Sequence, residues 1–380
     1  MTSVPSGVGA QAFFDTLAGL GPVFADRAVH SDVQGSFTAQ NHAELKRHRF
    51  YSAGVPADLG GGGLGYVELC RLVRTMAGSC PSTALSFSMH LHLLAATVWR
   101  HRRGLPGEAL LRRIAAEELA LVSTGGRDWL SSNGEAQAVP GGYRVTARKA
   151  FASGCEAGDV LVSSVCLDDP AGERSVLHFA VPLGSEGVQL LDDWHTLGMR
   201  GTGSRTVVLD GVFVPEGAVS LRRPAGRWHP VWATVLGVAL PLIMSVYLGV
   251  AEQAARLARA QAARRPADPG VPYLLGELTN ALTTADLAVQ DMIARNDEYA
   301  FPAELAVADA MLVRKTIASN AALEAVHKAM EVCGGVGYFQ GFGLEKLLRD
   351  VQAAPFHPLP EKAQHLFTGR VALGLEPVEA

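Results

Sequence analysis

The sequence predicts an α+β protein with three domains: an N-terminal α-helical domain, a small central β-barrel or sandwich domain, and a C-terminal four-helix bundle. Two changes of pattern along the chain predict this fold. Apolar residues recur three and four positions apart over 1–118, short strand-like runs fill 119–226, and helical spacing returns over 227–380. Strands and helices do not alternate, which excludes a doubly wound parallel sheet.

The prediction of the first two domains rests on short stretches with a clear pattern. LCRLVRTMAGSC and LHLLAATVWRHRRG are amphipathic at the helical period. The β domain contains YRVTARKAF, DVLVSSVCL, SVLHFAVPL and RTVVLDGVFV, separated by the turn signals GG, DDPAG and GSEG. Strands so closely spaced predict hairpins.

The C-terminal domain contains three long helical stretches, predicted at 231–264, 273–298 and 302–332, and a fourth helix is expected to begin near Gly343. The run WATVLGVALPLIMSVYLGVA is long enough to cross a bilayer. It contains Pro241 and continues with helical spacing into EQAARLARAQAARR, which favours a buried bundle helix over a membrane span.

The composition and charge limit the kinds of molecule that we expect this protein to bind. A net charge of −4 gives no basic surface for nucleic acid or an anionic membrane, so small molecules are the expected partners. The five cysteines have neither CxxC nor Cys/His spacing, so we expect no disulfide framework and no metal site. The N-terminus lacks the basic and apolar segments of a signal peptide, which predicts a cytoplasmic protein.

The glycine-rich stretch LGMRGTGSRTVVLDGVFVP raises the question of a phosphate-binding loop. Its glycines precede a predicted strand rather than a helix, and the third glycine of the dinucleotide fingerprint is missing. The other glycine run, LGGGGLG at 59–65, has no Lys-Ser/Thr after it. Both stretches are therefore interpreted as tight turns.

Two longer stretches, WHTLGMRGTGSRTVVLDGVFVP and EVCGGVGYFQGFGLEKLLRDV, carry a family resemblance. With the helix–β–helix order, they resemble the acyl-CoA dehydrogenase superfamily of flavoproteins over nearly the whole chain. The resemblance implies FAD, with FMN as the alternative, bound between the β domain and the bundle and closed by a second subunit. It also implies a homo-oligomer, a dimer of dimers.

The resemblance assigns the cofactor-binding residues in two groups. At the flavin ring it places an aromatic cover, Phe151, and the hydroxyls of Ser153 and Ser123. Ordinary alternation along a strand is the alternative for these three. At the pyrophosphate it places an arginine from across the dimer, Arg264 or Arg265, and either is alternatively a solvated surface residue. Glu331, Gly334 and Gly335 match the family segment that approaches the adenosine half.

The carboxylate that takes the α-proton in acyl-CoA dehydrogenases is not found where the resemblance predicts it. Counting from Arg349 and Asp350 places Pro358 at that position, and residues 217–251 contain no Asp or Glu. The nearest acid is Glu361, three residues further on. A proline cannot accept a proton, so the usual base is absent.

Histidines are the candidates to replace the acid, because imidazole titrates near neutral pH. His357 lies one residue before Pro358, and His90 and His92 lie on a predicted helix before the β domain. Two positions apart, His90 and His92 cannot share one helix face. Trp129, where the dehydrogenases have polar residues, lines a substrate pocket for a ring or belongs to the core.

These observations predict a flavin-dependent oxidoreductase that has lost thioester dehydrogenation. It uses reduced flavin and O2 to oxygenate a small organic molecule, with a flavin reductase or electron-transfer protein as partner. One alternative is an acyl-CoA or acyl-carrier-protein dehydrogenase with a displaced base such as Glu361. The other is a catalytically silent flavin-binding subunit.

Overall fold

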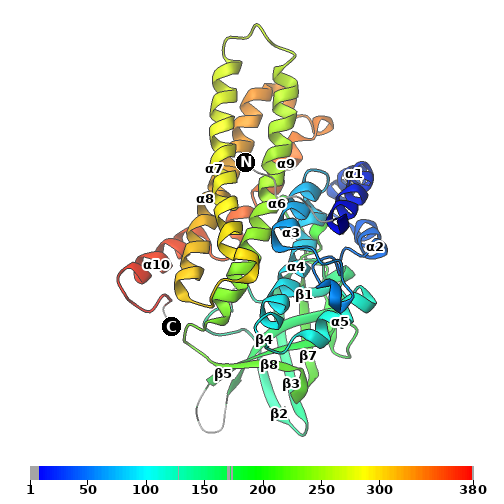
Figure 1. The fold of residues 1–380 in the computed structure, drawn as a ribbon, viewed down its shortest axis with the longest axis vertical. Coiled ribbons are helices and arrows are strands. Elements are labelled where there is room, and N and C mark those ends of the chain that lie inside the picture. Colours follow the sequence, from blue (N-terminus) through cyan, green and yellow to red (C-terminus); the bar gives the residue numbers. More distant parts are fainter. Residues whose placement is uncertain (1–7, 127, 169–171, 173, 379–380) are drawn as a thin grey trace.

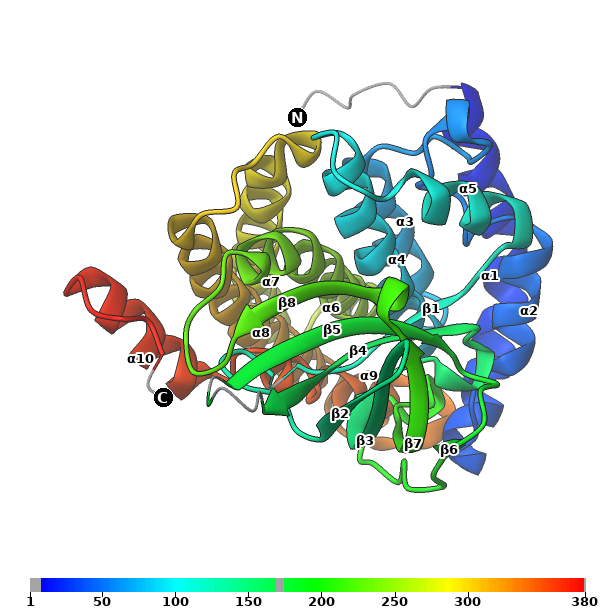
Figure 2. The ribbon, with the colours of Figure 1, turned by 90° about the horizontal axis from the view of Figure 1, so that it is seen from below.

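The computed structural model describes residues 8–378 except 127, 169–171 and 173. The first seven residues, where no signal peptide is expected, and part of the predicted DDPAG turn lie outside the described residues. Helices, then strands, then helices follow along the chain in the predicted order (Figure 1). The sheet lies below both groups of helices in Figure 1, and in Figure 2, which is seen from below, it lies in front of them.

The N-terminal helices form a layer beside the bundle. They are α1 (Val8–Gln34), α2 (Ala39–Arg47), α3 (Tyr66–Ala77), α4 (Pro81–His101) and α5 (Glu108–Glu117). The helix α4 is buried along most of its length, because it packs against the long bundle helix on one side and the first strand of the sheet on another.

The expected barrel or sandwich takes the form of one eight-stranded mixed sheet, in the order β6-β7-β3-β2-β4-β5-β8 with β1 beside β4. The strands are β1 (Leu121–Ser123), β2 (Glu135–Val139), β3 (Gly142–Ala152), β4 (Val160–Asp168), β5 (Arg174–Pro182), β6 (Val188–Leu190), β7 (Arg205–Pro215) and β8 (Val219–Pro224). Strand β4 runs parallel to β1 and β2, and antiparallel to β5. The predicted hairpins β2–β3 and β4–β5 are present.

The bundle contains the three predicted long helices, α6 (Val231–Ala262), α7 (Val271–Asn296) and α8 (Leu305–Cys333). The fourth helix begins where it is expected but is short. It ends as α9 (Leu344–Val351), and a helix resumes only at α10 (Glu361–Ala372). Prolines at 355, 358 and 360 explain the interruption, since proline has no N–H and its ring clashes inside a helix.

The apolar helix α6 is a core helix of the described structure. It is long and apolar enough to cross a membrane, yet 94% of its most apolar window is buried among its neighbours. At Gly249 it lies so close to α3 that a Cβ would lie 2.3 Å from the carbonyl oxygen of Arg74. Close packing of helices on all sides accounts for its hydrophobicity.

The glycine-rich loop is a turn that leads into strand β7, as the sequence predicts. It contains one turn of 3₁₀ helix over Arg200–Thr202, and Gly203 that follows has φ +54°, a left-handed conformation. At Gly198 the loop touches α9, where a Cβ would lie 2.1 Å from the Arg349 carbonyl oxygen. Its glycines therefore serve close backbone packing.

A buried carboxylate fastens this loop to the bundle. The Asp350 side chain, fully buried on α9, accepts a hydrogen bond from the Met199 N–H and pairs with the Lys346 ammonium at 2.5 Å. The next residue back, Arg349, pairs with Asp32 of α1 at 2.5 Å. One turn of α9 thus joins the N-terminal helices, the β domain and the bundle.

Asp350→Asn should lower the free energy of unfolding by about 3 kcal/mol, the range for breaking one partner of a buried ion pair. Asparagine keeps the acceptor for Met199 but leaves the ammonium of Lys346, whose side chain is only 12% exposed, without its counter-charge. Urea unfolding measures the loss. Glu108→Gln, which breaks an exposed pair with Arg112, is the control and should cost less than about 1 kcal/mol. Equal losses in the two variants would contradict the interpretation.

Candidate functional site

The β domain presents an exposed aromatic ring next to a cavity. Strand β3 carries Phe151, which is 58% exposed and meets Trp194 edge to face with ring centroids 5.8 Å apart. Phe151 borders a cavity of about 160 Å³, whose lining is completed by Gly125, Asp128, Asn133, Arg148, Lys149 and Ala150. An exposed aromatic beside a cavity suits a stacked ring system.

Three segments of the β domain contribute hydroxyl groups. Ser153 shares a hydrogen bond of 2.7 Å with Ser204, and Ser204 shares another of 2.7 Å with Thr202 in the glycine-rich loop. Ser123 ends strand β1, which pairs in parallel with β4, and is partly exposed. These side chains can offer hydrogen bonds to a polar ring edge.

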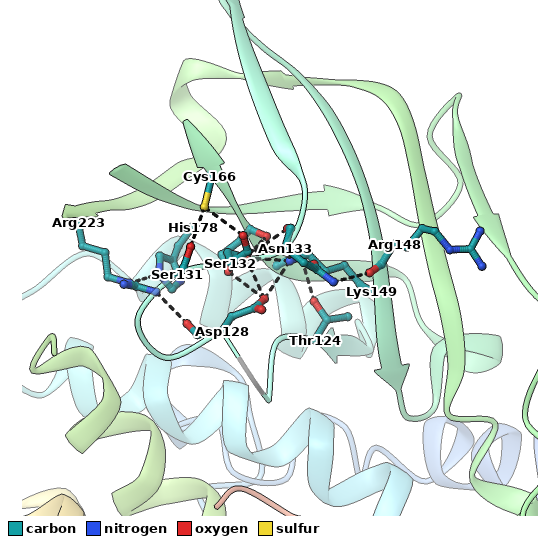
Figure 3. Close-up of polar contacts among 12 residues, drawn as sticks. Thr124, Asp128, Ser131, Ser132, Asn133, Arg148, Lys149, Cys166, His178 and Arg223 are labelled. Atoms are coloured by element: carbon teal, nitrogen blue, oxygen red, sulfur yellow. Dashed lines mark hydrogen bonds and ion pairs between the residues drawn. The ribbon is translucent and has the colours of Figure 1, made fainter. Parts of the chain in front are cut away.

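A buried ion pair stabilises the wall of the cavity, and sequence reasoning missed it. Lys149, 1% exposed, donates to Asp128 at 2.9 Å, to Ser132 at 2.8 Å and to the Asn133 carbonyl at 2.8 Å (Figure 3). Burial lowers the pKa of Lys149, and Asp128 opposes that shift. The available signal was a lysine at an inward position of the alternating strand VTARKA.

Arg223 is a second buried cation, and it binds the loop between β1 and β2. Arg223, 1% exposed, donates to the carbonyl oxygens of Asp128 at 2.8 Å and Leu130 at 2.9 Å, and to His178 Nε2 at 3.0 Å (Figure 3). The loop between β1 and β2 is therefore held by two cations from two different strands.

The bundle brings the segment 355–359 to the same loop. A Cβ on Gly126 would lie 3.1 Å from Pro358, so this proline faces the residue next to Gly125 of the cavity. His357, half-buried, lies within 2.8 Å of the Tyr247 hydroxyl through its Nε2. Burial, aided by the charge of Lys315, lowers the pKa of His357 to about 3, so the ring is neutral at ordinary pH.

The two helix α4 histidines differ in what they can do. His90 Nδ1 accepts from the Leu121 N–H at 3.0 Å and its Nε2 lies 2.8 Å from the Tyr51 carbonyl oxygen, so both ring nitrogens bind backbone. His92 is buried, and its Nδ1 has no hydrogen-bond partner among the described residues. Burial lowers the pKa of each to about 4. His90 thus fastens α4 to β1, whereas at His92 a backbone contact with Ser88 opposes the lowering of its pKa by burial.

Trp129 lies in an aromatic cluster and is 5% exposed. It stacks on Trp232 at 5.5 Å with ring planes 5° apart, and it also contacts Trp228 and Phe367. Its Nε1 donates to the Gly126 carbonyl oxygen at 3.0 Å. Of the two alternatives for Trp129, its described contacts favour the core, and lining a pocket stays a prediction.

Glu361 begins helix α10 and faces α8. Its carboxylate, on a side chain 38% exposed, accepts from Asn320 at 3.1 Å, and this bond is the first cause that lowers the pKa of Glu361. A carboxylate that is charged and partly solvated is a poor base for an α-proton, because its pKa lies well below neutrality.

The remaining predicted residues gather at the far tip of the bundle. Arg265 donates to the Val332 carbonyl oxygen, and its buried Nε has no partner among the described residues. Arg264 is exposed. Beside Val332 are exposed Glu331, whose carboxylate pairs with Lys328, and then Gly334 and Gly335, where nothing lies within 4 Å of an added Cβ.

The predicted flavin residues form two separate groups, one in the β domain and one at the turn that follows α6 (Figure 1). Trp232 at the start of α6 packs on Trp129, Tyr247 near the middle of the helix bonds His357, and Arg265 follows its end. The helix extends about 23 Å from Tyr247 to Ala262. The residues nevertheless fit a flavin: one group has an exposed aromatic and hydroxyls, and the other has an arginine with an unpartnered buried nitrogen beside open glycines.

Comparison with known proteins identifies the family. A model of the acyl-CoA dehydrogenase N-terminal domain matches residues 22–118, and a model of the C-terminal domain of the same family matches 230–357. Together these two matches cover more than half of the chain. The chain therefore belongs to the acyl-CoA dehydrogenase family, as the sequence motifs predict.

Several similar proteins are named as nitrososynthases, hydroxylases or monooxygenases, and another as a putative acyl-CoA dehydrogenase. The amino sugar nitrososynthase DnmZ of Streptomyces peucetius is 27% identical, over 93% of this chain and 91% of its own. The oxygenase component of an FADH(2)-dependent resorcinol hydroxylase from a Rhizobium strain is 26% identical, over 95% and 94%. The solved structure of KijD3 with FMN and a dTDP-linked amino sugar is 26% identical, with a TM-score of 0.88 over 98% of this chain and 96% of that one.

Proposed function

We propose that this protein is the oxygenase component of a flavin-dependent monooxygenase. It takes reduced flavin from a separate reductase and uses O2 to oxygenate a small molecule with an amine, a sulfur or an electron-rich ring. One observation carries the proposal. The chain segment that packs against the cavity loop, at the position of the dehydrogenase base, presents Pro358 and the neutral His357 instead of a carboxylate.

Reduced flavin supplies two electrons, so that one oxygen atom of O2 enters the substrate and the other leaves as water. The residues of this chain bind and orient. Phe151 covers the ring system and Ser123 and Ser153 bond its polar edge. His357, neutral and held by Tyr247, is the group that donates or accepts a proton. His92, with its unpartnered nitrogen, is the second candidate for that role.

A second copy of the chain completes the site in this proposal. Arg265 with Arg264 binds the phosphates of the neighbour's flavin, and Glu331, Gly334 and Gly335 receive the adenosine half, which favours FAD over FMN. The assembly is a dimer of dimers with closed symmetry. A reducing cytoplasm suits the five buried cysteines, which are all free.

Oxygen labelling tests the function directly. The purified chain, a flavin reductase, NADH and FAD should convert an amino sugar nucleotide, a thiophene or a resorcinol into a product that carries one atom from ¹⁸O₂, read by mass spectrometry. A dehydrogenase would instead bleach its oxidised flavin when mixed anaerobically with acyl-CoA. A silent subunit would do neither, and each of these two results contradicts the proposal.

His357→Asn should lower the oxygenation rate about 10²–10⁴-fold, the range for a positioned acid–base group. Glu361→Gln should change it less than about threefold, because that carboxylate faces Asn320 and solvent. Steady-state rates of product formation measure both, with flavin binding as the check on folding. Loss of activity in Glu361→Gln alone would favour the dehydrogenase alternative.

Arg265→Met should weaken binding of FAD by about tenfold to a hundredfold, because a charge-assisted bond to phosphate contributes about 1.5–3 kcal/mol. Arg264→Met is the neighbouring control and should have the smaller effect, since Arg264 is exposed while Arg265 contacts Val332. Fluorescence titration with FAD and FMN measures both affinities.

Mixing two inactive variants tests whether the site is shared. In a mixed oligomer of Arg265→Met and His357→Asn chains, one site per interface combines two intact halves. Activity should therefore return after mixing and reassociation. Absence of complementation, or a monomer that keeps its flavin in light scattering, would contradict the shared site.

A further inference from the structure

A buried lysine of α8 holds the segment that carries His357. The Lys315 ammonium donates to the carbonyl oxygens of Pro355 at 3.1 Å and Leu359 at 3.0 Å, and the residue is only 1% exposed. These two carbonyls lie on either side of His357 in sequence. The segment interrupts the fourth helix, contains Pro355 and Pro358 and is followed by Pro360, so it has few N–H groups of its own to bond its carbonyls.

The contact between Tyr247 and His357 fixes which ring nitrogen carries the proton. The Tyr247 hydroxyl is fully buried, and His357 Nε2 at 2.8 Å is its partner among the described residues. If Nε2 carried the hydrogen, the hydroxyl proton of Tyr247 would have no acceptor, which is costly in a buried site. Tyr247 therefore donates to Nε2, and the proton of the neutral imidazole is on Nδ1.

We propose that Lys315 is a positioning residue that fixes the 355–359 segment so that Tyr247 holds His357 as the neutral Nδ1–H tautomer facing its ligand. The inference rests on the proposed function only for the use of that Nδ1–H group, which serves as a hydrogen-bond donor to the reacting oxygen during oxygenation and keeps its own proton.

The charges around His357 agree with this role. The titratable and charged groups that act there are Tyr247 from α6, Lys315 from α8 and, through Lys315, Glu361 from α10; Asp350 of α9 acts on Tyr247. Burial lowers the pKa of Lys315 to about 8, and Glu361 opposes the shift, so the ammonium form dominates at neutral pH. A positive charge beside His357 opposes a second proton on the ring.

A neutral side chain could not replace Lys315 in both respects. It would lack either the two donors that bind Pro355 and Leu359 or the charge that, in addition to burial, lowers the pKa of His357. The sign of the expected change follows. Removing the cation raises the pKa of His357, so protonation of the ring moves to higher pH.

The first test needs no substrate and uses the wild-type full chain. In protein labelled with ¹⁵N-histidine, the His357 resonances are assigned by their loss in His357→Asn. At pH 7.5 the nitrogen shifts should show a proton on Nδ1 and none on Nε2. A proton on Nε2, or a rapidly exchanging mixture of tautomers, would overturn the proposal without any variant of Lys315.

The second test compares Lys315→Met with Lys315→Arg. The methionine variant should raise the His357 pKa by at least about one unit and lower oxygenation at pH 7.5 about tenfold to a hundredfold, because the segment is no longer positioned. The arginine variant keeps charge and donors and should recover most of the rate. Lys362→Met removes an exposed lysine, 88% exposed at its side chain, and should match wild type in both measurements.

The outcomes separate this inference from the proposed function. If Lys315→Met leaves both the His357 pKa and the acidic limb of the rate profile unchanged, the positioning role is wrong although the enzyme is an oxygenase. If wild type shows the Nδ1–H tautomer but no incorporation of ¹⁸O, the proposed function is wrong and the local geometry stands. If the methionine variant does not fold, the wild-type tautomer and Tyr247→Phe, which should release Nε2 to share the proton, decide the question.

Discussion

The fold depends on one buried carboxylate at the junction of its three regions. Asp350 accepts the Met199 N–H of the glycine-rich loop while it pairs with Lys346, and Arg349 beside it binds Asp32 of α1. Met199 and Asp32 are far from α9 in sequence, whereas Lys346 and Arg349 belong to α9 itself. A helix of eight residues has little stability alone, so α9 is held by these contacts as much as it provides them.

The position of the candidate site follows from that junction. Because α9 is fixed against the β domain, the chain that leaves it must pass the loop between β1 and β2 within a few residues. This places Pro358 against Gly126 and His357 next to Tyr247. Lys149 and Arg223 bind that loop from two strands. The cavity is lined by residues of this loop and of β3, and Pro358 of the bundle contacts the same loop at Gly126. Such contacts suit a reaction that requires exact placement of the reacting groups.

The sequence predicted the long elements well because their signals are local. A clear hydrophobic period marks the three long bundle helices and strands β3, β4, β5 and β7. The motifs and the order of these elements together indicated the family, which the two family models confirm. The break after Val351 was not predicted, although the prolines that cause it are visible in the sequence.

The partners of the site residues could not be predicted, because each arises from tertiary contact alone. Tyr247 lies in an apolar run where a buried tyrosine looks like any core residue, and Lys315 is a single cation in an amphipathic helix. His90 and His92 were equivalent in sequence, and only the backbone of Tyr51 and Leu121 distinguishes them.

The distance between the two groups of predicted flavin residues supports the proposed shared site. Tyr247 near the middle of α6 holds His357 beside the cavity loop, and about 23 Å of helix separates it from the end of α6 that precedes Arg265. Each group is open in a complementary way: the β domain has the exposed ring of Phe151, and the turn after α6 has an arginine near glycines with open space around them. A symmetric pair of chains would let each group meet the other's, which is the arrangement that closed two-fold symmetry provides.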